Sequence, residues 1–221
     1  MDGSSSQTAV EDFCNQSYPM CHHYRLLANS SELSDAVSAH ISHSQMSLPF
    51  GDFYPLSQVP VVRLNPEGRR EIVAMQWGLL PFWWKPSGRR KSRKAFQRKC
   101  FNARSETIHE KPAFREAFKH RRCLIPATEF MERGHYFYLT KSEPFMFAGL
   151  WERWEDETET VESCTIVTTI PNETIEAVGH HRMPVVLTTD VEYDTWLGPD
   201  ALGNAELEWL FMPLDSSALN C

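Results

Sequence analysis

The strand-like runs of this sequence are short and closely spaced, and this spacing restricts the fold more than any other feature. Val59 to Leu64 and Arg70 to Trp77 flank the turn Asn65 to Gly68, which is typical of a hairpin. Further runs are Cys123 to Pro126, His135 to Thr140, Phe145 to Trp151, Ser163 to Thr169 and Val185 to Leu187. We predict a second hairpin from 135–140 and 145–151, turning at Lys141 to Pro144.

Helical signals are few. Asn29 followed by Glu32 resembles a capping box and predicts a helix from about Ser30 to Ile41. Two further short helices are expected, one after Pro112 and one from Thr189 to about Gly198. Because repeats and regular βαβ alternation are missing from the pattern, we predict an α+β fold. It would be a single domain over residues 21–221, a mostly antiparallel, barrel-like sheet with a few short flanking helices.

Charge is distributed unevenly along the chain. The net charge is −7, yet Lys85 to Arg104 contains nine Lys and Arg and no acidic residue, so the remainder carries −16 (−7 minus 9). A basic segment on an acidic body is typical of nucleic-acid contact, and a solvated loop of charges is the alternative. Glu152 to Glu162 is acidic, and we expect it to form a surface turn.

Several classes of protein are disfavoured by the sequence. No apolar run approaches the ~18 residues that span a bilayer, so we expect no membrane segment. The first nineteen residues are polar and do not resemble a secretory signal, which favours a cytoplasmic protein. Six cysteines occur without a CxxC pair, so we expect free thiols rather than a zinc site or a disulfide framework.

Four short segments combine residue types that carry chemistry. They are Met20-Cys21-His22-His23-Tyr24, Phe101 to Thr107, Cys123 to Glu132, and His180-His181-Arg182-Met183-Pro184. Each segment alone is a weak signal, because a lone Cys is usually a buried apolar residue and a lone Glu usually lies on the surface. Their order along the chain is more specific than any one of them.

Taken in order, these segments resemble the SOS-response-associated peptidase (SRAP) family. The matching motifs are Met20-Cys21, Trp77-Gly78 to Trp83-Trp84, Asn102 to Thr107, Arg122 to Ala127 with Glu132, and His180 to Leu187. The resemblance covers residues 20–220 and departs at His22-His23-Tyr24, where the family commonly has Gly-Arg-Phe. It implies the SRAP fold and a protein that binds single-stranded DNA and links covalently to abasic sites.

The resemblance also implies roles for individual residues. Cys21 would be the nucleophile, whose α-amine and thiol close a thiazolidine ring with the aldehyde of an abasic deoxyribose. Asn102 would orient the cysteine and the sugar, Glu132 would shuttle protons, and His180 would open the sugar ring. Glu129 competes with Glu132 for the carboxylate role, but Glu132 keeps the family spacing. An α-amine has a pKa of ~7.7–8.0, so a useful fraction is neutral at pH 7.

DNA contacts are implied in the same way. Arg104 and Arg182 match phosphate-contacting arginines, Thr168 matches a phosphate hydrogen-bond partner, and Trp83 and Trp84 match an aromatic wedge beside the lesion. One of the two tryptophans is equally consistent with a place in the core, because Trp is often mostly buried.

The start of the chain departs from the family, in which the nucleophile directly follows the initiator Met. We expect residues 1–20 to be a disordered leader or a misannotated start. Translation starting at Met20, removal of the leader by the protein itself, and loss of the crosslinking activity are the three alternatives, and we favour the first.

Three functions follow from this pattern. The first is an abasic-site crosslinking enzyme, the second is a cysteine autopeptidase that uses Cys21, Glu132 and His180, and the third is a non-covalent single-strand binder with an inactive site. No motif for a cofactor or metal is present, so we expect neither. The expected partner is single-stranded DNA with abasic sites, bound by a monomer associated with the nucleoid.

Overall fold

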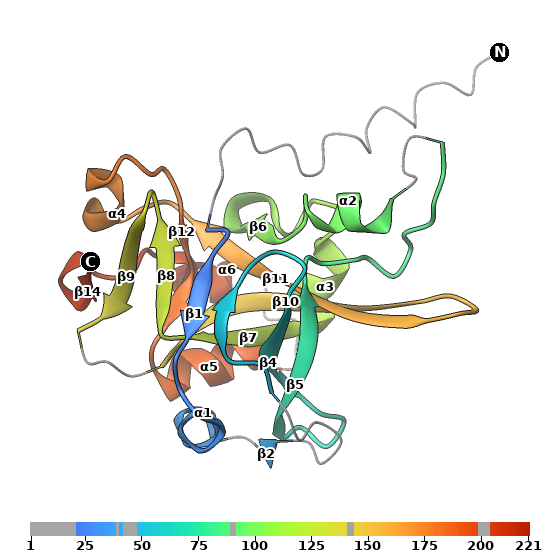
Figure 1. Ribbon diagram of the computed structural model, residues 1–221, viewed down its shortest axis with the longest axis horizontal. Helices are drawn as coiled ribbons and strands as arrows, with labels where there is room; N and C mark the ends of the chain where they lie inside the picture. Colours follow the sequence, from blue (N-terminus) through green and yellow to red (C-terminus); the bar gives the residue numbers. More distant parts are fainter. Residues whose placement is uncertain (1–20, 39, 42–47, 89–91, 141–143, 199–203) are drawn as a thin grey trace.

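A closed five-stranded barrel forms the centre of the computed structural model, which describes residues 21–38, 40–41, 48–88, 92–140, 144–198 and 204–221 (Figure 1). The proposed leader lies outside these residues. The barrel strands are β4 (Gln58–Leu64), β5 (Arg70–Trp77), β7 (Arg122–Ala127), β10 (Phe145–Glu155) and β11 (Thr160–Thr169). Adjacent strands run antiparallel in the order β5-β4-β7-β10-β11, and a parallel pairing of β11 with β5 closes the ring. The predicted barrel-like, mostly antiparallel α+β fold is therefore confirmed.

Short strands extend the barrel ladder. Strand β6 (Asn102–Arg104) runs parallel to β11, while β12 (Met183–Pro184) pairs antiparallel with it. Strand β13 (Val186–Leu187) pairs with β10, and β2 (His40–Ile41) pairs with β5. As a result β11 has β6 and β12 beside it along the same half of its length, which brings two distant parts of the sequence together.

A second, smaller sheet covers one side of the barrel. Its order is β14 (Leu219–Asn220), β9 (His135–Leu139), β8 (Glu129–Glu132), β1 (Tyr24–Leu26) and β3 (Gly51–Phe53), all antiparallel. Side chains alternate between its faces, as in any strand. Tyr24 and Phe130 point inward and contact Phe147 of the barrel, with ring centroids 5.5 and 6.0 Å apart.

The helices are short and lie around the sheets. They are α1 (Ser30–Val37), α2 (Arg93–Gln97), α3 (Arg115–His120), α4 (Glu173–Ala177), α5 (Asp190–Leu197) and α6 (Asn204–Leu207), with 3₁₀ turns at Ser105–Thr107, Glu208–Phe211 and Ser216–Ala218. The predicted capping box of α1 is present. This helix ends before the predicted Ile41, because Ser38 adopts a left-handed conformation with φ of 47°.

Two predictions about the strands are wrong. Strand β9 does not form a hairpin with β10; it pairs with β8 and β14 in the smaller sheet. The acidic stretch Glu152 to Glu162 is not a surface turn over its length, because β10 and β11 continue through it and pair as far as Glu155 and Thr160. This extension forms an arm that projects from the body of the molecule (Figure 1).

One continuous apolar core, from Cys21 to Leu219, joins the barrel to the smaller sheet. A separate small cluster contains Leu80, Trp84 and Trp154, the last of which belongs to the arm. Among the described residues, no helix is long and apolar enough to cross a membrane.

Candidate functional site

Cys21 lies at the entrance to β1 and is almost fully buried, with 1% of its surface exposed. Its Sγ donates a weak hydrogen bond to the carbonyl oxygen of His23 at 3.7 Å. Burial raises the pKa of the Cys21 thiol well above its usual value, and the neighbouring charge of Glu132 raises it further. The thiol is therefore protonated at rest, and a base must remove its proton before it can act as a nucleophile.

Asn102 holds the backbone of Cys21. It begins β6, which the parallel pairing Ile166 to Asn102 places beside β11. The Asn102 Nδ2 donates to the carbonyl oxygen of Cys21 at 3.0 Å. Its Oδ1 is buried and has no hydrogen-bond partner among the described residues, which is rare for a buried acceptor.

Glu132 is the last residue of β8 and is buried at 2% exposure. It shares the inner face of the strand with Phe130, two residues earlier, which explains how a carboxylate comes to lie inside. A two-residue turn at Arg133 and Gly134, with φ of 52° and 85°, follows it and returns the chain into β9. The carboxylate is thus fixed at the closed end of a hairpin.

His180 faces Glu132 from the other side of the site. Gly179, with φ of 76°, ends the turn after α4 in a left-handed conformation and redirects the chain. The His180 Nε2 lies 3.4 Å from Glu132 Oε2, and its Nδ1 lies 2.6 Å from the carbonyl oxygen of Arg182. Since a carbonyl can only accept, Nδ1 carries the proton and Nε2 is left to exchange one with Glu132.

The buried carboxyl of Glu132 is an unusually weak acid. Burial raises its pKa to about 8, although the neighbouring backbone N–H and thiol of Cys21 act in the opposite direction. At neutral pH the carboxyl therefore keeps its proton for most of the time, and it can donate or accept one near physiological pH. The structure brings together four of the predicted residues, Cys21, Asn102, Glu132 and His180, and their arrangement can move protons beside a thiol.

The predicted phosphate contacts lie beside this cluster. Arg182 is half-buried and donates to Thr168 O at 2.7 Å and to Glu106 Oε2 at 2.8 Å. Arg104 is exposed at the end of β6, opposite Thr168 in the ladder. Arg104 therefore presents a positive charge to solvent, whereas the charge of Arg182 is already paired with the Glu106 carboxylate.

The two predicted wedge tryptophans occupy different environments. Trp84 is 4% exposed and packs against Trp154, so its ring lies within the small apolar cluster and not on the surface. Trp83 is half-buried, and its Nε1 donates to Pro112 O at 3.2 Å. Phe82, which the sequence analysis did not single out, is 54% exposed. An aromatic wedge at this loop would thus involve Trp83 and Phe82.

The basic segment is only partly free. Within its described residues, Lys85, Lys94, Arg98 and Lys99 are exposed. Arg93 is held by the acidic arm: it forms an ion pair with Glu159, and its guanidinium lies 5.3 Å from the Trp154 ring centroid. The arm therefore fixes one end of α2, while the other described cations of the segment are exposed.

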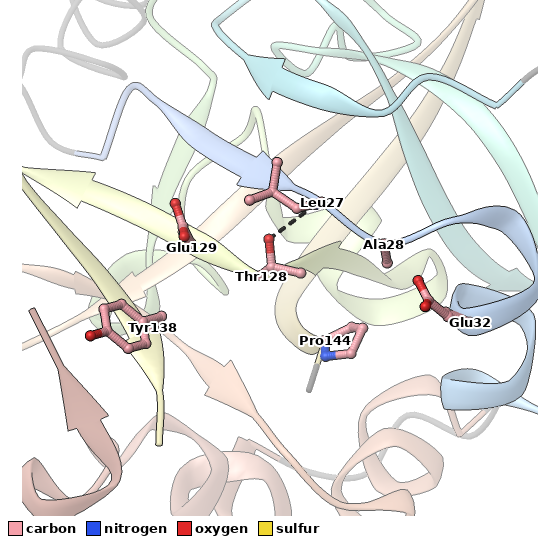
Figure 2. Close-up of a pocket in the computed structure, with 7 residues that line it drawn as sticks. All are labelled: Leu27, Ala28, Glu32, Thr128, Glu129, Tyr138 and Pro144. Atoms are coloured by element: carbon pink, nitrogen blue, oxygen red, sulfur yellow. Dashed lines mark hydrogen bonds between the residues drawn. The ribbon is translucent and has the colours of Figure 1, made fainter. Parts of the chain in front are cut away.

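A surface pocket of about 450 Å³ lies at the opposite end of the β1–β8 ladder from Cys21 (Figure 2). Its lining residues are Leu27, Ala28, Glu32, Thr128, Glu129, Tyr138 and Pro144. Two of these residues are joined by a hydrogen bond, which the Leu27 backbone donates to Thr128 Oγ1 at 3.1 Å (Figure 2). None of the predicted catalytic residues lines this pocket.

The structure offers no obvious metal ligands in the regions it describes, since no three His, Cys, Asp or Glu side chains there are grouped to hold an ion. The five described cysteines, Cys21, Cys100, Cys123, Cys164 and Cys221, are free thiols.

Comparison with known proteins agrees with the motif order. The sequence profile of the SOS response associated peptidase (SRAP) family matches residues 20–221. "Abasic site processing protein YoqW" of Bacillus subtilis (strain 168) is 34% identical over 212 residues, covering 89% of this chain and 88% of that protein. "Abasic site processing protein HMCES" of Gallus gallus is 27% identical over 194 residues, covering 75% of this chain and 56% of that protein.

Solved structures resemble the fold as well. A Bacteroides thetaiotaomicron protein superposes with a TM-score of 0.76 at 27% identity, covering 90% of both chains. A Bordetella bronchiseptica protein gives a TM-score of 0.75 at 26% identity, covering 90% of this chain and 97% of that one.

Proposed function

The chain belongs to the SOS response associated peptidase (SRAP) family, and from this membership we propose that it processes abasic sites in DNA by forming a covalent thiazolidine through Cys21. The observation that carries the proposal is the convergence of Cys21, Asn102, Glu132 and His180 from four separate segments. A buried carboxyl beside a thiol is costly to maintain, and such groups are concentrated at functional sites.

The first half of the reaction forms an imine. In its open form the abasic deoxyribose is an aldehyde, and the α-amine of Cys21 adds to its carbon to give a carbinolamine. Protonation of the carbinolamine hydroxyl lets it leave as water, and the imine remains. Glu132, with its pKa of about 8, is a suitable donor for that proton, and His180 can return one to it through Nε2.

The second half closes the ring. The Cys21 thiol adds to the imine carbon and transfers its proton to the imine nitrogen, so the whole reaction releases one water. Asn102 contributes by fixing the Cys21 carbonyl, which leaves the amine and the thiol of the same residue oriented toward one carbon.

The substrate we propose is single-stranded DNA. Arg104 and the exposed cations of α2 and its flanks would contact phosphates without reading sequence, which suits a protein that seeks a lesion. Trp83 and Phe82 would stack beside the lesion.

Imine formation requires a free amine on Cys21, whereas residues 1–20 precede it in the sequence. The test is the intact mass of the full chain and of a chain beginning at Met20, each incubated with a single-stranded oligonucleotide containing one abasic site. We expect a Cys21-terminated protein to gain the oligonucleotide mass less one water and to keep it on denaturation. If neither chain gains that mass, the covalent proposal is wrong and a non-covalent binder replaces it.

Autoproteolysis of the leader is a second candidate activity of the same site. It is favoured by the position of the Cys21 backbone N–H beside Glu132, because that nitrogen would be the leaving group. The thiol would attack the Met20 carbonyl, the amine would depart with a proton from Glu132, and Glu132 would regain a proton from the thiol. Water would then hydrolyse the resulting thioester. On storage, the full chain should lose residues 1–20, and Cys21→Ala should retain them. Equal retention in both proteins would exclude this activity.

A further inference from the structure

An exposed tyrosine is stacked on a buried histidine two residues after Cys21. The rings of Tyr54 and His23 lie parallel, with centroids 4.4 Å apart and an angle of 13° between planes. His23 is 3% exposed, whereas Tyr54 is 48% exposed. One face of the tyrosine ring is therefore covered by the imidazole, and much of the remaining ring surface is open to solvent.

The histidine that supports this ring is held from several sides. Its Nε2 lies 2.7 Å from Asp52 Oδ1, and its ring meets Tyr136 edge-on at 5.6 Å. Arg25 braces both neighbours, because it donates to Asp52 at 2.9 Å and lies 3.8 Å above the Tyr136 ring centroid. The imidazole cannot move without disturbing this network, so it provides a rigid base.

The backbone of Tyr54 is fixed as well. Ser57 donates from its backbone to the Tyr54 carbonyl at 2.9 Å, and the Ser57 hydroxyl accepts from the Tyr54 backbone at 3.2 Å. Pro55 and Leu56 occupy the centre of this turn, and Leu56 has a φ of 79°, a region that favours glycine. Because this backbone conformation is unfavourable for leucine, the surrounding contacts must hold the turn in it.

The stack is coupled directly to the nucleophile. The antiparallel register of β1 and β3 pairs Tyr24 with Phe53, so one step further His23 lies opposite Tyr54 at the end from which Cys21 enters. The carbonyl oxygen of His23 also accepts the hydrogen bond from the Cys21 thiol. The residue that supports the open aromatic ring is thus the one that positions the sulfur.

We propose that Tyr54, supported by His23, is a stacking platform for the nucleobase next to the abasic position. This inference rests on the proposed function. An abasic nucleotide offers no base for stacking, so the neighbouring base is the nearest aromatic surface that can hold the strand in register with Cys21. A rigid ring suits this role, because little conformational entropy is lost when a base stacks on it.

The platform is tested with two oligonucleotides. Both contain one abasic site; in the first, ordinary nucleotides flank it, and in the second, tetrahydrofuran spacers replace both neighbours and retain the phosphates. The chain beginning at Met20 is compared with Tyr54→Ala, Tyr54→Phe and the matched control Tyr138→Ala, which removes another exposed tyrosine from the far end of the smaller sheet. Folding of each variant is checked by thermal unfolding.

We expect Tyr54→Ala to slow adduct formation roughly 5- to 100-fold on the first oligonucleotide and to leave the second nearly unchanged. Tyr54→Phe and Tyr138→Ala should behave as the parent chain on both. Equal slowing on both oligonucleotides, or none on either, would overturn the platform. If the parent chain forms no adduct, the proposed function fails separately, and the platform is then judged by the same selective loss in equilibrium binding of the two oligonucleotides.

Discussion

Two glutamates on one short strand, Glu129 and Glu132, occupy very different surroundings. Glu129 begins β8 on its outer face, is half-buried beside the surface pocket, and accepts from Arg25 at 3.3 Å. Glu132 ends the strand on its inner face, is nearly fully buried, and faces His180 and Cys21. The first pairs with a guanidinium in reach of water, whereas burial keeps the second protonated for most of the time at neutral pH.

The odd separation of the two residues explains the difference. Side chains three apart along a strand point to opposite faces, so only one of the two can share the inner face with Phe130. The acid–base candidate is therefore the carboxylate an even number of residues from Phe130, because that spacing puts it on the same, inner face of the strand. Both residues are carboxylates and they are close in sequence, yet Glu132 is the buried one, and burial raises its pKa to about 8.

The largest effect should come from Cys21, which lies at the Glu132 end of the β1–β8 ladder. Cys21→Ala retains the backbone held by Asn102 but removes the sulfur, so no ring can close. We expect stable adduct to fall roughly 10³-fold or more. Denaturing electrophoresis measures the adduct, and borohydride should still trap an imine from the remaining amine. A stable adduct without borohydride would show that the thiol is dispensable.

Exchanging each carboxylate for its amide tests the comparison directly. Glu132→Gln cannot donate or accept the proton, and we expect adduct formation to slow about 10²-fold or more. Glu129→Gln, the matched control, should change the rate by less than about 2-fold, because its side chain contacts Arg25 and not the site. Single-turnover rates with one abasic oligonucleotide measure both. Similar losses in the two variants would contradict the division between the ends of the strand.

The raised pKa of Glu132 also predicts a pH dependence of stability. Folding favours the protonated carboxyl, so its contribution is complete below the unfolded pKa of 4.5 and declines as pH rises toward the folded value of about 8. Glu132→Gln removes this decline. We expect the variant to gain about 2–5 kcal/mol in unfolding free energy relative to the parent between pH 5 and pH 9. Urea denaturation at both pH values measures it, and parallel curves would show that Glu132 ionises freely in the folded protein.

The smallest effect is expected at the other end of the ladder. Thr128→Val removes the hydroxyl that accepts from the Leu27 backbone at 3.1 Å and lies 3.2 Å from the Arg25 carbonyl. We expect a loss of about 1 kcal/mol in unfolding free energy. Adduct formation should stay within about 2-fold of the parent chain, because Thr128 shares no hydrogen-bond partner with the four catalytic candidates and substitutions at such separate positions act independently. A large loss of activity would reveal coupling between the two ends.

Local chemistry accounted for the parts of the fold that the sequence could predict. The caps of α1 and α5 were readable because Asn29 with Glu32 and Thr189 with Glu192 satisfy backbone groups within four residues. The hairpin with β10 was wrong because the partner of β9 is set by the turn at Arg133 and Gly134, and Arg-Gly is not among the common two-residue turn sequences.

The candidate site divides in the same way. The order of the motifs pointed to Cys21, Asn102, Glu132 and His180, and the structure places these four together. The sequence could not predict which of two adjacent tryptophans is buried. Trp84 packs on Trp154 and is almost fully buried, whereas Trp83 is half-buried. The His23–Tyr54 stack was missed because it joins two strands that no local pattern pairs.

The projecting arm of β10 and β11 consists of rungs that use one residue from each strand, from Trp151 with Cys164 to Glu155 with Thr160. Lengthening or shortening it by a matched pair leaves the pairing of Gly149 with Ile166, and therefore β6 and Asn102, in place. An unmatched single residue would have to be absorbed by a bulge. The arm can therefore vary in reach in steps of two residues while the site below it stays the same, so insertions in this region need not impair the chemistry.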